Sequence, residues 1–286
     1  MSDPVVPPES LTPSRVVSVT RVTDRGSERT SDVAAAEEPL DVRLHGRSFA
    51  IIMRTPGDDR ALVAGFLQSE RIIRSADDIG AVEHCRHPDH ATAHHVVDVF
   101  LRGDAASRVP QVLEHRRQVI ANSSCGVCGR ATIEELLADV APLSSTAVID
   151  VAVIRSLPSR LRARQSTFDE TGGLHGAAIC ASSGEIVAAA EDVGRHNAVD
   201  KAIGALLLED APRPPALTPA ALIVSGRVSF EIVQKAWLAG IPLVAAISAP
   251  TSLAVELAEQ AGITLIGFLR DTGLNIYAHP SRVRGV

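Results

Sequence analysis

Three short apolar runs in the last third of the chain most constrain its fold. They cover residues 221–225 (ALIVS), 243–248 (LVAAIS) and 263–268 (ITLIGF), and each has the length of a buried strand. Helical patterns at 230–239 and 252–261 separate them. Apolar strands that alternate with helices form a mostly parallel sheet covered by helices on both faces. This region therefore predicts an α/β fold.

The chain before these runs divides into three parts. Residues 1–14 hold four prolines and read as a disordered tail. Residues 15–120 predict a β-rich domain, with strands at 16–22, 39–42, 47–54 and 95–101 and a helix at 58–69. Residues 121–286 predict the α/β domain, which adds helices at 133–140, 155–165 and 196–208, strands at 177–181 and 186–191, and a proline-rich loop at 211–219.

Composition excludes several classes of protein. The net charge of −6 argues against a general affinity for nucleic acid or for an anionic membrane. No apolar run approaches the roughly 18 residues of a membrane span, and the N-terminus does not read as a signal peptide. With only four cysteines in 286 residues, we expect a reducing, cytoplasmic setting in which thiols are reactive or metal-bound.

The segment Cys125-Gly126-Val127-Cys128-Gly129 carries the strongest chemical signal. Two thiols at this spacing carry sulfur, shuttle electrons or hold a metal. Zinc needs about four ligands; the further candidates are Cys85 and the histidines between His84 and His95, and there is no second CxxC. A thioredoxin-like pair would start a helix after the first strand of a βαβ unit, whereas this pair lies between two differently patterned regions. A nucleophilic or persulfide-carrying cysteine stays open.

Four further segments each place glycine or charge beside a strand. They are 171–178 (TGGLHGAA, with His175), 191–201 (EDVGRHNAVDK, with His196), 225–229 (SGRVS) and 267–275 (GFLRDTGLN). A tight turn explains the first equally well, and a solvated helix start could explain the second. Because ligands bind beyond the carboxyl ends of strands and helix N-termini bind anions, we expect one crevice for a phosphate- or nucleotide-containing ligand, with the cysteine loop reaching over it.

Together these segments resemble the FdhD/NarQ family of sulfurtransferases needed for formate dehydrogenase activity. The resemblance rests on CGVCG, TGGLHGAA, EDVGRHNAVDK, SGRVSFEIVQKAWLAGIP, SAPTSLAVELAEQAGITLIGFLR and LNIY, and it is strong over about the last 165 residues. It implies a cytidine-deaminase-like three-layer α/β/α C-terminal domain with a smaller β-rich N-terminal domain. It also suggests a homodimer.

The resemblance implies a specific chemistry. Cys125 would take sulfur as a persulfide from a cysteine desulfurase, with Cys128 as its partner. The sulfur would pass to the molybdenum cofactor, a bis(molybdopterin guanine dinucleotide), before its insertion into formate dehydrogenase. Cofactor contact maps to Phe268, Leu269, Arg270, Asp271, Thr272 and Gly273, and we add Ser225, Gly226, Arg227, His175 and His196 as expected cofactor-binding residues.

The chain departs from the deaminases at the residues that hold their zinc. His196-Asn197-Ala198 lacks the glutamate of a His-x-Glu motif, and residues 225–228 lack both cysteines of a Pro-Cys-x-x-Cys motif. We therefore expect no deamination, no metal-binding residue and no zinc cofactor. The alternative function is a non-catalytic chaperone of the dehydrogenase that binds zinc through its CxxC motif.

Overall fold

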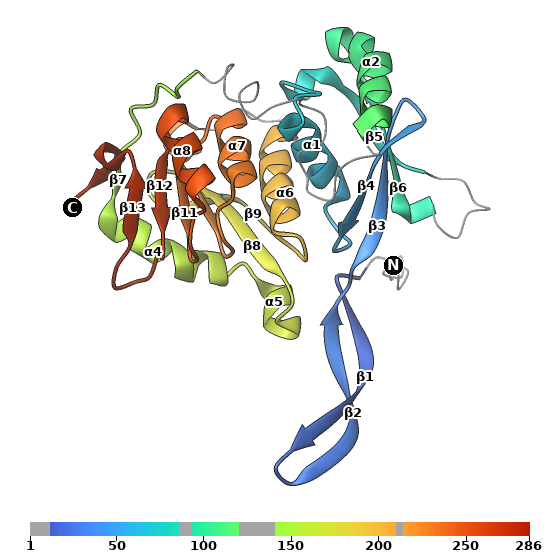
Figure 1. Cartoon of the computed structure of the whole chain (residues 1–286), viewed down its shortest axis with the longest axis vertical. Coiled ribbons are helices and arrows are strands. Elements are labelled where there is room, and N and C mark those ends of the chain that lie inside the picture. The colour runs from blue at the N-terminus through green and yellow to red at the C-terminus, as the bar shows by residue number, and fades with distance from the viewer. Residues whose placement is uncertain (1–11, 86–92, 120–140, 210–213) are drawn as a thin grey trace, which may run out of the picture.

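The structure is a computed structural model that describes residues 12–85, 93–119, 141–209 and 214–286 (Figure 1). Cys125, Cys128 and the helix expected at 133–140 lie outside these residues. So does most of the expected N-terminal tail, although Ser14 already begins the first strand.

A six-stranded sheet forms the centre of the C-terminal domain, in the order β13-β12-β11-β10-β8-β9. Its middle strands β10 (Ala221–Val224), β11 (Leu243–Ala246) and β12 (Thr264–Gly267) run parallel. β8 (His175–Cys180) pairs antiparallel with β10 and with β9 (Ile186–Asp192), and β13 (Asn275–Ala278) pairs antiparallel with β12. The expected parallel core of the sheet is thereby confirmed.

Helices cover both faces of this sheet (Figure 1). α6 (Arg195–Leu207), α7 (Phe230–Leu238) and α8 (Ser252–Ala261) pack on one face. α4 (Val151–Arg162) packs on the other through Ile154, Leu157 and Leu161. α4 begins four residues before the helix expected at 155–165, because the Asp150 side chain accepts a hydrogen bond from the Ala152 N–H and caps it there. The three-layer α/β/α fold is confirmed.

The smaller N-terminal domain contains a four-stranded sheet in the order β4-β3-β6-β5. Its strands are β3 (Glu38–Leu44), β4 (Arg47–Arg54), β5 (Ile79–His84) and β6 (Val96–Leu101), and its helices are α1 (Asp59–Ser69) and α2 (Gly103–Val119). β5 and α2 were not expected from the sequence. α2 contains Pro110, which obscures a helical pattern.

A hairpin projects from the N-terminal domain (Figure 1). β1 (Ser14–Thr23) and β2 (Gly26–Ala35) pair in continuous register from Ser14↔Ala35 to Thr23↔Gly26. Most of their side chains are exposed, which explains why β2 carries no apolar alternation and was not expected. The other short elements among the described residues are α5 (Ser166–Thr171), the pair β7 (Ile149–Asp150) and β14 (Val283–Arg284), and the 3-10 turns η2 (Ala76–Asp78), η3 (Ala93–His95), η4 (Pro215–Leu217) and η5 (Pro280–Arg282).

The two domains meet where α1 packs against α6. A Cβ atom added to Gly204 of α6 would lie 1.8 Å from the carbonyl oxygen of Ala61, and one added to Gly65 of α1 would lie 2.0 Å from the carbonyl oxygen of Asp200. The two helix backbones are therefore in direct contact, which only glycine permits at these positions. Among the described residues, no helix combines the length and apolarity that a membrane span requires.

Candidate functional site

The predicted ligand loops meet at the carboxyl edge of the parallel strands. The Ser225 N–H donates to the Gly176 carbonyl, and the Gly176 N–H donates to the Ser225 hydroxyl, both at 2.9 Å. The loop after β10 is hydrogen-bonded to the loop after β11, because the Val228 N–H donates to the Ala249 carbonyl at 3.1 Å. The Phe268 N–H in turn donates to the Ser248 carbonyl at 3.0 Å. One row of hydrogen-bonded loops thus joins the segments that the sequence singled out.

His175 and Arg195 face the glycine of the Ser225-Gly226-Arg227 loop. A Cβ added to Gly226 would lie 3.3 Å from His175 Nδ1 and 3.7 Å from Arg195 Cβ. Burial, with the positive charge of Arg195 and the neighbouring His196, lowers the pKa of His175 despite the opposing charge of Asp192. The Arg195 Nε is buried and has no hydrogen-bond partner in the part of the chain that the structure describes. A buried guanidinium donor without a partner favours an anionic ligand here.

His196 lies between Ser229 and Glu231. Its Nε2 is 2.7 Å from Glu231 Oε2 and 3.2 Å from Ser229 Oγ. The hydrogen bond from His196 lowers the pKa of Glu231, although partial burial of the carboxylate opposes this shift. Serine and acid contact the same ring nitrogen, whereas a nucleophilic relay requires them on opposite nitrogens. These three residues therefore do not form a serine-hydrolase triad.

Three helices begin at this edge. α6, α7 and α8 start at Arg195, Phe230 and Ser252, and each follows a strand that ends there. Thr251 caps α8 by accepting from the Ala254 N–H at 3.3 Å. Within the described residues no side chain caps α6 or α7. Their first N–H groups can hydrogen-bond an anion, which the helix dipole also favours.

In the Phe268–Gly273 turn, most of the expected cofactor-binding residues are exposed, and one is buried. Phe268 has a positive φ of 51° and its residue is 47% exposed, so a strained backbone holds an aromatic ring at the surface. Asp271, Thr272 and Gly273 are also exposed. Leu269 is fully buried in the core beside α4, so only its backbone could contact a ligand. The Arg270 N–H donates to the Gly273 carbonyl at 2.8 Å and closes the turn.

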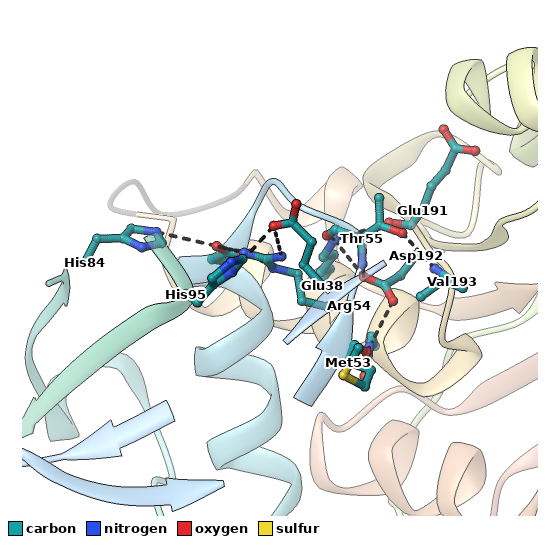
Figure 2. Close-up of polar contacts among 12 residues, drawn as sticks. Glu38, Met53, Arg54, Thr55, His84, His95, Glu191, Asp192 and Val193 are labelled. Atoms are coloured by element: carbon teal, nitrogen blue, oxygen red, sulfur yellow. Dashed lines mark hydrogen bonds and ion pairs between the residues drawn. The ribbon is translucent and has the colours of Figure 1, made fainter. Parts of the chain in front are cut away.

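A buried carboxylate fixes the start of α6 against the N-terminal domain (Figure 2). Asp192 Oδ2 lies 2.8 Å from Lys201 Nζ and accepts from the Thr55 N–H at 3.1 Å. Its Oδ1 accepts from the Gly194 N–H at 2.8 Å and from Asn197 Nδ2 at 2.9 Å. Sequence reasoning assigned no role to Asp192 or Glu231. The sequence does carry one sign of a buried polar network. Asp200 and Lys201 are adjacent charged residues in an otherwise apolar helix.

A cleft of about 460 Å³ opens beside this junction. Met53 and Phe66 line it from the N-terminal domain, and Gly194, His196 and Asn197 line it from the start of α6. Clefts between domains are common ligand sites. The expected cofactor-binding residue His196 thus faces both the loop edge and the domain junction.

The expected catalytic cysteines, Cys125 and Cys128, lie outside the described residues. The first described residues after them attach at the opposite edge of the sheet, where the Ala141 carbonyl accepts from Trp237 Nε1 and the Leu143 N–H donates to the Ala261 carbonyl. The expectation that the cysteine loop reaches over the ligand crevice is therefore not tested. Of the described cysteines, Cys180 is buried, and burial raises the pKa of its thiol to about 12.

Comparison with known proteins places the chain in a family. The FdhD/NarQ family profile matches residues 35–284. Proteins named "Sulfur carrier protein FdhD" are similar to most of the chain. The one from Streptomyces coelicolor is 46% identical over 93% of this chain and 94% of its own length. The one from Saccharolobus solfataricus is 46% identical over 92% of this chain and 95% of its own.

A solved structure agrees with these matches. The crystal structure titled "a putative formate dehydrogenase accessory protein from Desulfotalea psychrophila" superposes with a TM-score of 0.75 and 25% identity. The superposition covers 95% of this chain and 99% of that one. The matches include both domains and the loops of the carboxyl edge. The chain belongs to the FdhD/NarQ family.

Proposed function

We propose that this chain is a sulfur carrier that accepts persulfide sulfur on Cys125 and delivers it to a molybdenum cofactor destined for formate dehydrogenase. The observation that carries the proposal is its similarity, over more than nine-tenths of its length, to proteins named sulfur carriers. The CGVCG segment supplies the thiols that such a role requires. We place the reaction in the cytoplasm, where thiols stay reduced.

The loading step is a thiolate exchange. The Cys125 thiolate attacks the terminal sulfur of a cysteine persulfide on the desulfurase, and the desulfurase thiolate leaves. One S–S bond forms and one breaks, so the step needs no oxidant or reductant. Cys128 is the partner thiol.

The cofactor would bind along the carboxyl edge. A bis(molybdopterin guanine dinucleotide) carries two pyrophosphates and two guanines. The N-termini of α6 and α7, with Arg195 and Arg227, suit the pyrophosphates. The exposed ring of Phe268 can stack on a guanine, an interaction that contributes about 1–3 kcal/mol per base in other proteins.

The length of the intervening chain limits how far Cys125 can lie from Ala141. Fifteen residues lie between Cys125 and Ala141, so sixteen residue steps join them. A fully extended chain of that length reaches about 55 Å, because each residue spans at most about 3.3–3.6 Å.

The first test is mass spectrometry of the intact protein after incubation with a cysteine desulfurase and cysteine. We expect a mass increase of one sulfur atom, located on Cys125 and lost in Cys125→Ser. The buried Cys180 serves as an internal control that stays unmodified. An unmodified Cys125, or full activation of formate dehydrogenase by the Cys125→Ser variant, would overturn the proposal.

Ligand binding tests the second half of the proposal. Guanosine diphosphate should bind the wild type, and Arg227→Ala and Phe268→Ala should weaken binding without changing the circular dichroism spectrum. Stoichiometric zinc that disappears when Cys125 and Cys128 are replaced would instead support the zinc-binding chaperone. We further propose that the chain forms a homodimer, which sedimentation analysis can check.

A further inference from the structure

Two histidines and a buried glutamate converge in the N-terminal domain, outside the site described above. Glu38 begins β3, and His94 and His95 end η3, which leads into β6. One ligand atom from each of the three side chains lies within 4.8 Å of the other two. The Glu38 side chain is only 6% exposed. We propose that Glu38, His94 and His95 bind a divalent transition-metal ion, with zinc as the ion the donor set fits best.

Two ring nitrogens of this cluster have no hydrogen bond in the described part of the chain. His94 Nε2 and His95 Nδ1 are both buried, and within the described residues neither has a hydrogen-bond partner. Leaving a buried polar atom unsatisfied costs about 1–3 kcal/mol. Two such atoms on neighbouring residues, both close to a buried carboxylate, therefore call for a shared ligand.

The geometry of His95 sharpens this argument. Its Nδ1 lies 3.5 Å from Glu38 Oε2 (Figure 2). A histidine binds a metal ion through an unprotonated ring nitrogen. His95 Nδ1 faces a carboxylate oxygen, so one ion can bind both atoms.

A cation satisfies this arrangement better than a proton does. One added proton can bridge His95 and Glu38, but it leaves His94 Nε2 without a partner. A metal ion can bind all three atoms at once. Tetrahedral zinc with bonds of about 2.0–2.1 Å holds its ligand atoms about 3.4 Å apart, so the 3.5 Å contact between His95 and Glu38 already fits. The His94 ligand atom lies within 4.8 Å of the other two, so its ring needs a shift of at most about 1.4 Å.

Two arginines lie next to Glu38, and their positive charges would repel a metal ion. Nearby carboxylates reduce this repulsion. Arg54 Nη1 lies 3.3 Å from Glu38 Oε2, but the same guanidinium is held by Asp59 through two bonds of 2.8 and 3.0 Å. Arg54 can therefore stay paired with Asp59 when a metal ion binds Glu38 Oε2. Arg15 pairs with the other oxygen, Glu38 Oε1. The carboxylates of Glu38 and Asp59 balance the two arginines, so the cluster carries no net charge before the ion enters.

Two imidazoles and one carboxylate form a set of three ligands with an open fourth position, which suits zinc. The three proposed ligands include no residue of the CxxC motif, and the site departs from the expectation that no residue of this chain binds a metal. It would tie the base of the hairpin, which leads into Glu38, to the strand that follows His95.

The test uses the full-length chain with Cys85, Cys125 and Cys128 replaced by serine, so that thiols cannot bind the metal. Zinc is titrated by calorimetry and counted by metal analysis. We expect one zinc per chain. X-ray absorption should show only nitrogen and oxygen neighbours at about 2.0–2.1 Å, without sulfur at about 2.3 Å.

Variants then assign the ligands. In this background, His94→Ala and His95→Ala should each weaken zinc binding at least about tenfold, since outer-shell partners alone change metal affinity about 10–100-fold. The control is His279→Asn, which removes an imidazole that contacts the Glu259 carbonyl at 2.9 Å in the other domain. Circular dichroism without zinc checks that each variant folds.

Two results would overturn the proposal. One is zinc binding by the serine-substituted chain no tighter than by its His94→Ala and His95→Ala variants. The other is the absence of bound zinc in a chain whose circular dichroism is native. Because this background lacks Cys125 and Cys128, either outcome leaves the sulfur-carrier proposal to its own test.

Discussion

The contact between α1 and α6 supports a quantitative prediction about Gly204. In Gly204→Ala the new methyl group would lie 1.8 Å from the Ala61 carbonyl oxygen, where ordinary contact begins at about 3.4 Å. The obstacle is backbone, so no side-chain rotation relieves it. The two helices must separate by about 1.5 Å, and a gap of even 0.5–1 Å forfeits a quarter to a half of the dispersion energy of the atoms that face it.

The expected change in stability combines two terms of opposite sign. Overpacking a tight contact costs typically about 1–3 kcal/mol, and a backbone-to-backbone clash belongs at the upper end of that range. Replacing a helical glycine by alanine gains about 1 kcal/mol of helix propensity. We therefore expect Gly204→Ala to lower the free energy of unfolding by about 2 kcal/mol or more.

Urea unfolding measures this change, with two probes. Far-ultraviolet circular dichroism follows the helices. Fluorescence follows Trp237, the only tryptophan, whose ring lies 5.0 Å from the guanidinium of Arg71 across the domain junction. The matched control is Ala205→Gly on the exposed face of α6, which should lose about 1 kcal/mol through helix propensity alone.

A double variant tests the cause. The Cβ added to Gly204 would also lie 2.8 Å from the Gly65 backbone nitrogen, so both glycines serve one helix contact. Once Gly204→Ala has separated the helices, Gly65→Ala should cost less than it does alone. A Gly204→Ala protein as stable as the wild type, or losses that simply add, would refute the reasoning.

Three further predictions concern buried or partly buried groups. Lys201→Met leaves the fully buried Asp192 carboxylate without its cation and should cost about 3–5 kcal/mol in urea unfolding; wild-type stability would contradict the importance of this ion pair. The His175 imidazole should titrate below its ordinary pKa of about 6.5 in NMR because it is partly buried and lies near Arg195, and Arg195→Gln should raise that pKa. Cys180, with a pKa of about 12, should resist alkylation at pH 8 in the folded protein and react after unfolding.

The strands that could be predicted best from the sequence are those whose side chains are buried on both faces of the sheet. β10, β11 and β12 are continuous apolar runs, and such runs can only be central strands or buried helices. Parallel direction then brings their following loops to one edge, so the meeting of the loops around Ser225 and Phe268 could be predicted. The hairpin strand β2 could not, because both of its faces are exposed and no hydrophobic period marks it.

The contacts that hold the site residues in place could not be predicted, because they join parts of the chain that are far apart in sequence. Asp192 accepts from the backbone of Thr55, which lies 137 residues away in the other domain. Glu231 gains its role only because α7 starts beside His196. Leu269 is in the expected ligand-binding segment, yet the strained turn at Phe268 directs it into the core. Each of these depends on tertiary packing.

The projecting hairpin has a practical consequence. Within the described residues, β1 and β2 pair only with each other, and an isolated two-stranded hairpin is marginally stable in water. Its turn at Asp24 and Arg25 is exposed and belongs to none of the hydrophobic clusters. A fluorophore or affinity tag introduced between these two residues would therefore leave the folded body intact, and would offer a handle for following the protein while it works.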